Sequence, residues 1–86
     1  MESGNNSLEV NTKLFGRLLA MAYRYQDEGN LRQAADIYWT LVDVHRINPQ
    51  VEAARAQLLQ IADDHERNNA RHAARSIYER LMALDN

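Results

Sequence analysis

The stretch Ala34–Val42, AADIYWTLV, returns after a shift of 40 positions as Ala74–Met82, ARSIYERLM. The same shift also aligns apolar residues of the preceding segments, and it needs no gap. The aligned pairs are Ala34 and Ala74, Ile37 and Ile77, Tyr38 and Tyr78, Leu41 and Leu81, Val42 and Met82, Leu18-Leu19 and Leu58-Leu59, Met21 and Ile61, and Ala22 and Ala62. Because self-similarity at a fixed period is typical of repeat architectures, this repeat predicts a helical repeat protein.

The composition is that of a small helical protein. The 86 residues include one proline, three glycines and no cysteine, and the formal net charge is −2. A chain of this length forms one domain, and its content of Ala, Leu, Arg and Glu favours helix. The lack of cysteine excludes disulfides and is compatible with a cytoplasmic location. The balanced charge argues against a nucleic-acid partner, and no apolar run is long enough to predict a membrane span.

The spacing of apolar residues, together with the turn residues between them, predicts four helices. The expected ranges are about 8–28, 31–47, 49–67 and 70–84. Ser7 and Asn48 are expected to cap helix N-termini. Gly29 and Asn69 are expected to adopt the left-handed conformation that ends a helix. Because the connections are short, we expect neighbouring helices to run antiparallel, which gives an all-α fold of two helical hairpins.

The domain organisation follows from the same pattern. Residues 1–7 are polar and are expected to form a flexible N-terminus. Residues 8–86 are expected to form one domain, with units at about 8–47 and 48–86. The second predicted helix is apolar over more than half of its circumference, whereas a surface helix needs a much narrower stripe. We therefore expect this helix to lie centrally, with neighbours on more than one side.

The repeat resembles the tetratricopeptide repeat (TPR) family. That family's unit is a helix pair with a Leu–small–Tyr pattern, a Gly at the turn, and an Ala followed by an aromatic residue on the second helix. The matching residues are Leu18, Met21, Ala22, Tyr25, Gly29, Ala34, Tyr38 and Leu41 in the first unit, and Leu58, Ile61, Ala62, His65, Asn69, Ala74, Tyr78 and Leu81 in the second. The period of 40 exceeds the family's usual 34. The resemblance implies a right-handed helical repeat that acts as an adaptor or scaffold.

In TPR proteins the first helix of each unit lines a concave groove that binds peptides. The residues at the matching outward positions are Leu19, Tyr23, Asp27, Leu59, Asp63 and Glu66. The resemblance therefore implies an apolar strip with an acidic rim, which suits a protein or peptide segment that carries basic residues. The alternative is that these are single exposed apolar side chains, which are normal on any protein.

A second hypothesis is a structural role through self-association. Ile77 and Leu84 lie on the side of the last predicted helix where a further unit would stack. Because repeat arrays usually need at least three units and polar caps, either the chain belongs to a longer array or a homodimer covers this face. Trp39 is either an anchor of such an interface or a side chain part-buried against a neighbouring helix.

No motif in the sequence predicts catalysis. His45, His65 and His72 have no second ligand at helical spacing, so no metal site is expected. The run Asp63–Glu66 occupies one helical turn and points in different directions. The chain has no Gly-rich phosphate loop and no nucleophile elbow. We therefore expect a binding protein without a cofactor and not an enzyme.

Overall fold

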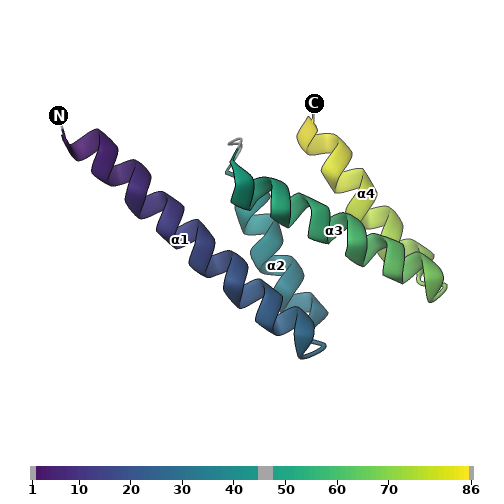
Figure 1. Cartoon of the computed structure of the whole chain (residues 1–86). Coiled ribbons are helices and arrows are strands. Elements are labelled where there is room, and N and C mark those ends of the chain that lie inside the picture. Colours follow the sequence, from purple (N-terminus) through teal and green to yellow (C-terminus); the bar gives the residue numbers. More distant parts are fainter. Residues whose placement is uncertain (1, 45–47, 86) are drawn as a thin grey trace.

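The computed structural model describes the backbone of residues 2–44 and 48–85 and the side chains of residues 12–44 and 48–84. Over these residues the chain is all-helical. Its four described helices are α1 (Glu2–Asp27), α2 (Leu31–Val42), α3 (Pro49–Arg67) and α4 (Arg71–Asp85). Short turns at residues 28–30 and 68–70 reverse the chain, so that α1 packs on α2 and α3 packs on α4 (Figure 1).

The helices have unequal numbers of neighbours. Among the described helices, α3 packs against α1, α2 and α4, and α2 packs between α1 and α3. The backbone of α4 approaches that of α3 alone in the described part of the chain. The central position expected for the second helix is therefore confirmed, and α1 and α4 form the two edges of the molecule (Figure 1).

The two turns inside the hairpins have the predicted left-handed residues. Gly29 has a φ of 85° and Asn69 has a φ of 65°. Equivalent backbone bonds close these turns: the Asn30 N–H donates to the Tyr25 carbonyl at 2.8 Å, and the Ala70 N–H donates to the His65 carbonyl at 2.7 Å. Glycine adopts this conformation without strain and asparagine tolerates it next best, so each hairpin can turn within three residues.

The start of α3 also follows the prediction. The Asn48 side chain accepts a hydrogen bond from the Val51 N–H at 2.8 Å, and Pro49 is the first helical residue. The cap satisfies one of the first-turn amides that have no partner inside the helix. Proline suits this position because it has no N–H to satisfy and its fixed φ is helical.

The ends of two other helices differ from the prediction. α1 begins at Glu2, so the expected start after an N-cap at Ser7 is wrong. Once a helix has nucleated, each added residue costs little, so a polar segment can extend it. α2 ends at Val42 because the Val44 N–H donates to the carbonyl of Leu41, three residues back, in a tightened turn. The rest of the predicted range, 45–47, lies outside the described residues.

The core is built mainly from α2 and α3. Its buried residues are Ala22, Ala34, Tyr38, Trp39, Leu41, Val42, Val51, Ala54, Leu58, Ile61, Ala62, Ala74, Ile77 and Leu81. The alanines of this set let the paired helices approach closely. The apolar side chains of Leu14, Met21 and Met82 are exposed. They lie on the edge helices α1 and α4, which have fewer neighbours to cover them. In the described part of the chain, no helix is both long and apolar enough to cross a membrane.

Candidate functional site

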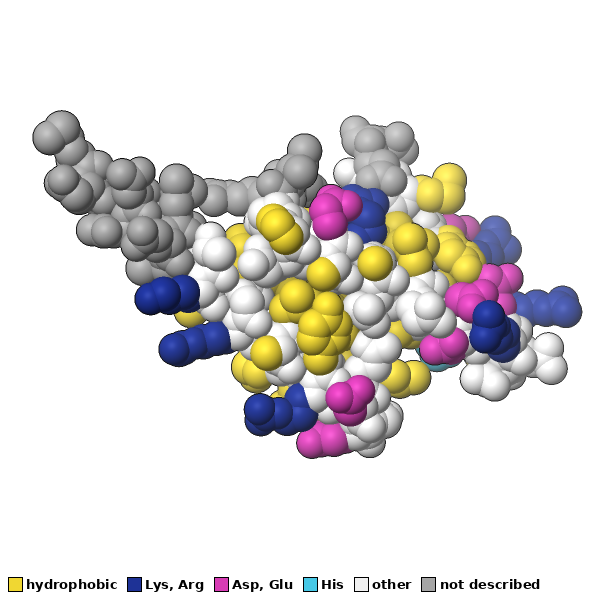
Figure 2. Space-filling view, in the orientation of Figure 1, with side chains coloured by type: hydrophobic (Ala, Val, Ile, Leu, Met, Phe, Trp, Pro, Cys, Tyr) yellow, Lys and Arg dark blue, Asp and Glu magenta, His cyan; other side chains and the backbone are white. Residues whose placement is uncertain are grey.

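The residues expected to bind a partner lie on α1 and α3, which pack against each other. We call this set the α1/α3 surface: Leu19, Tyr23 and Asp27 on α1, and Leu59, Asp63 and Glu66 on α3. Because α1 and α3 are repeats of each other, Leu19 and Leu59 occupy equivalent places on the two helices. Figure 2 shows hydrophobic side chains gathered between these helices, with acidic side chains towards the edges of the same face.

The apolar members of the α1/α3 surface differ in exposure. Tyr23 is 38% exposed and Leu59 is 45% exposed, whereas Leu19 is half-buried and packs against the core. Tyr23 lies edge-on to the buried Tyr38, with ring centroids 6.3 Å apart and an interplanar angle of 61°. This aromatic contact stabilises the position of the Tyr23 ring, whose exposed part is available to a partner.

Two of the three acidic members already have partners within the chain. Asp63 pairs with Arg67 at 3.1 Å, one helical turn away. Glu66 accepts a hydrogen bond from the Tyr78 hydroxyl at 2.6 Å. Exposed ion pairs of this kind contribute little to stability, so a cation of a partner can compete for Asp63. Asp27 is exposed near the end of α1.

The tyrosines of the two hairpins have perturbed acidity. Burial, followed by the electrostatic effects of Tyr23 and Asp27, raises the pKa of Tyr38 to about 12. The hydrogen bond to Glu66 is the main cause that raises the pKa of Tyr78. Both hydroxyls are therefore protonated at neutral pH and act as hydrogen-bond donors.

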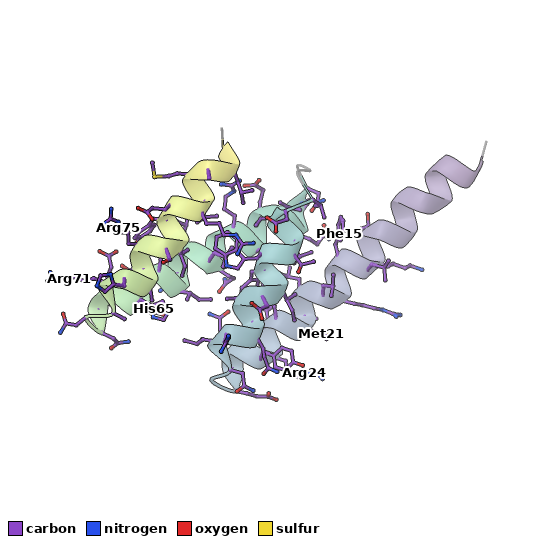
Figure 3. The ribbon with its side chains drawn as sticks, turned by 180° about the vertical axis from the view of Figure 1, so that it is seen from behind. Phe15, Met21, Arg24, His65, Arg71 and Arg75 are labelled. Carbon is purple, nitrogen blue, oxygen red and sulfur yellow. The ribbon has the colours of Figure 1, made fainter. Side chains whose placement is uncertain are left out.

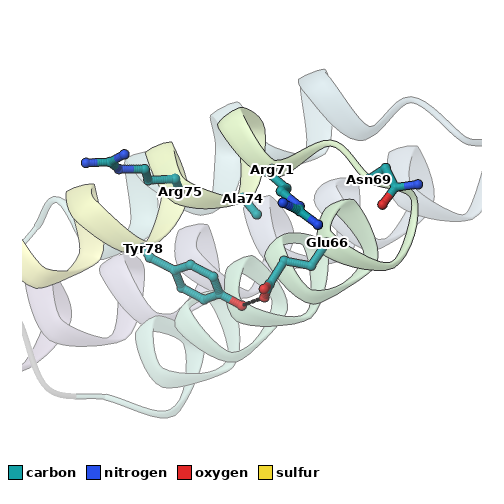
Figure 4. A pocket seen from close by; sticks show the side chains of 6 residues that line it. All are labelled: Glu66, Asn69, Arg71, Ala74, Arg75 and Tyr78. Carbon is teal, nitrogen blue, oxygen red and sulfur yellow. Dashed lines mark hydrogen bonds between the residues drawn. The ribbon is translucent and has the colours of Figure 1, made fainter.

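A pocket of about 400 Å³ opens between the end of α3 and the beginning of α4 (Figure 4). Its lining residues are Glu66, Asn69, Arg71, Ala74, Arg75 and Tyr78. Arg75 pairs with Glu79 at 2.9 Å. Sequence spacing could not indicate this hollow, because a hollow depends on how α3 and α4 pack.

A second hollow, of about 200 Å³, lies on α1 and was also missed by the sequence analysis. It is lined by Met21, Arg24, Tyr25 and Glu28. Its sequence signal is the continuation of the apolar stripe of α1 through Met21 and Tyr25. In Figure 3, Met21 and Arg24 lie on α1 towards the bottom of the molecule, and Arg71 and Arg75 lie on α4 at its left side.

The residues considered for self-association lie mostly inside the fold. Trp39 is buried, and the Arg80 guanidinium lies over its ring, 4.1 Å from the centroid. The alternative that Trp39 is covered within the chain is therefore confirmed. Ile77 is also buried, so its expected position on an outer stacking face is wrong. Like Ala74, it lies on the core side of α4. Leu84 is half-buried against the core.

Over residues 12–44 and 48–84, no three His, Asp or Glu side chains come together as a possible metal site. No protein family, curated protein or solved structure matches the chain.

Proposed function

We propose that the protein is an interaction module that docks a segment of a partner protein on the α1/α3 surface. The observation that carries this proposal is the pair of exposed apolar side chains, Tyr23 and Leu59, on two helices that pack side by side. Exposed apolar groups on neighbouring elements, rimmed by polar residues, are typical of binding surfaces. An amphipathic helix or an extended segment can supply the apolar anchors that such a surface receives.

The charge of the α1/α3 surface favours a basic partner. Asp27, Asp63 and Glu66 border the apolar residues, and Arg67 is the cation paired with this rim. Lys or Arg side chains that flank the apolar anchors of a partner would meet these carboxylates. Such contacts at a rim influence the association rate and the choice of partner more than the affinity.

The proposal also includes how the two hairpins stack and where in the cell the protein acts. We propose a right-handed TPR-like stacking of the two hairpins, acting in the cytoplasm. The neighbour pattern supports the stacking, because the second helix of the first hairpin packs on the first helix of the next. The equivalent turn geometry at Gly29 and Asn69 supports it as well. The lack of cysteine is compatible with the location.

A peptide-display selection with the intact chain tests the docking proposal. We expect selected peptides to combine apolar anchors with Lys or Arg, and to lose at least about tenfold in affinity, roughly 1.4 kcal/mol, when Leu59 is changed to Asp. Met82→Asp, an exposed apolar residue on another helix, is the matched control and should bind normally. Selected peptides that bind Leu59→Asp and Tyr23→Asp as well as the original chain would show that the α1/α3 surface is not the site.

A further inference from the structure

The edge helix α1 exposes apolar residues that are buried in its repeat partner α3. Leu14 is 51% exposed, whereas its equivalent Ala54 is fully buried. Met21 is 44% exposed, whereas its equivalent Ile61 is buried. The difference has a simple cause: α2 packs on α3, and within the described chain no helix occupies the equivalent place on α1. We call Leu14 and Met21 the α1 stripe.

The other edge helix, α4, also exposes an apolar residue whose equivalent is buried in its repeat partner, α2. Val42 of α2 is buried, whereas its equivalent Met82 of α4 is 67% exposed. Leu41 and its equivalent Leu81 are both buried, so the difference is confined to one side of the helix. On that side α2 is covered by α3, and in the described part of the chain α4 is not covered by an equivalent helix. We call Arg71, Arg75 and Met82 the α4 surface.

The two uncovered surfaces fit each other because their repeat equivalents already meet inside the chain, where α2 packs on α3. The α1 stripe corresponds to the side that α3 presents to α2, and the α4 surface corresponds to the side that α2 presents to α3. We propose that a second copy of this chain covers the α1 stripe by placing its own α4 there, in the way that α2 lies on α3. The α1 stripe and the α4 surface lie on helices that do not contact each other in the described chain, so one copy cannot cover its own stripe.

The charges agree with this arrangement. The end of α2 adjoins the beginning of α3 (Figure 1), so the same pattern brings Met82 towards Leu14 and the beginning of α4 towards the end of α1. The beginning of α4 carries Arg71 and Arg75, both exposed. The end of α1 and the turn after it carry the exposed pair Asp27 and Glu28 against one arginine, Arg24. Arg71 therefore meets an acidic pair, which favours this orientation. Arg75 is shared with Glu79, its ion-pair partner at 2.9 Å.

The two hollows described above lie at this contact. The pocket of about 400 Å³ is at the beginning of α4, and the hollow of about 200 Å³ is near the end of α1. The long side chains of Arg75 and Arg24 stand beside them and can enter the hollow of the facing copy. Because the contact joins two different surfaces, each copy keeps a free end, and further copies can add to form short linear stacks.

The solution mass of the 86-residue chain, measured by light scattering after size exclusion over a concentration series, tests this inference. We expect the average mass to rise with concentration beyond that of one chain. Met21→Asp removes the α1 stripe and Met82→Asp removes the α4 surface. Each variant alone should stay monomeric at concentrations where the original chain associates, because its association is weakened at least tenfold. Leu59→Asp, an equally exposed apolar residue on the α1/α3 surface, is the control and should associate like the original chain.

Mixing the two variants gives the most specific result. Met21→Asp keeps an intact α4 surface and Met82→Asp keeps an intact α1 stripe, so the mixture should form a one-to-one dimer and nothing larger. Circular dichroism confirms that both variants fold, and Leu14→Asp replaces Met21→Asp if that variant does not. A chain that stays monomeric at every concentration would overturn the inference, as would a dimer that survives either single substitution. The latter would indicate a symmetric interface instead.

Discussion

The tyrosines at equivalent places in the two hairpins make equivalent hydrogen bonds in different surroundings. Tyr38 donates to Gln26 at 2.5 Å and is fully buried, whereas Tyr78 donates to Glu66 at 2.6 Å and is only partly buried. The ring of Tyr23 packs against Tyr38, and α3 covers α2. The comparison shows that the repeated sequence sets the local geometry, while the neighbouring helices set the burial.

The hydrogen-bond acceptors of the two tyrosines match this difference in burial. Gln26 is a neutral amide beside a buried hydroxyl, and Glu66 is a carboxylate beside an exposed one. Burying a charge costs much more free energy than burying an amide that has a hydrogen-bond partner. The charged member of the pair therefore occurs in the hairpin where water still reaches it.

The largest expected difference between the hairpins comes from removing each tyrosine ring. Tyr38→Ala should lower the free energy of unfolding by about 3–5 kcal/mol, because it leaves a cavity in the core. Tyr78→Ala should cost only a small fraction of that, since water can fill the space. Urea unfolding followed by circular dichroism measures both changes. Equal losses would mean that the two hairpins are equally packed, contrary to the comparison.

Alkaline pH should separate the same two residues. The pKa of Tyr38 is raised to about 12 in the folded chain. The folded state therefore holds this proton more tightly than the unfolded state, whose tyrosine pKa is near 10. The stabilisation is complete below about pH 10 and is lost as pH rises towards about 12, by roughly 2–3 kcal/mol. Urea unfolding at several pH values measures this loss. Tyr38→Phe should show a smaller loss, and an unchanged one would exclude Tyr38 as its origin.

The smallest expected effect concerns the two left-handed turns. Gly29→Ala should lower the free energy of unfolding by about 1–2 kcal/mol through backbone strain. Apart from Gly29 and its two chain neighbours, no residue has a heavy atom within 4 Å of the added Cβ, so a steric clash does not contribute. Asn69→Gly should instead raise the stability of the second hairpin by a smaller amount, since asparagine already tolerates this conformation. Thermal unfolding of both variants measures the changes. A stable Gly29→Ala variant would mean that the first turn can change its conformation.

The helices and their ends could largely be predicted from the sequence, because they depend on residues close together in the chain. Three helix boundaries were predicted correctly from Pro49, Gly29 and Asn69. The exposure of Leu14 and Met82 could not be predicted. Helical spacing places a residue on an apolar stripe, but it does not indicate whether another helix covers that stripe. The α1/α3 surface was predicted in the same way, and its Leu19 proved half-buried.

The amino-acid sequence by itself determined the repeat and the hairpin turns at Gly29 and Asn69. The tyrosine hydrogen bonds, which join residues 12 positions apart, form only when the two helices of each hairpin pack together. Only the tertiary structure decided which copy of each repeated residue is buried. It also brought Arg80 over Trp39 and within 3.2 Å of Asp43, linking α4 to the first hairpin. The physical reason is that torsion angles and nearby hydrogen bonds act within a few turns of helix, whereas burial depends on how many helices surround a residue.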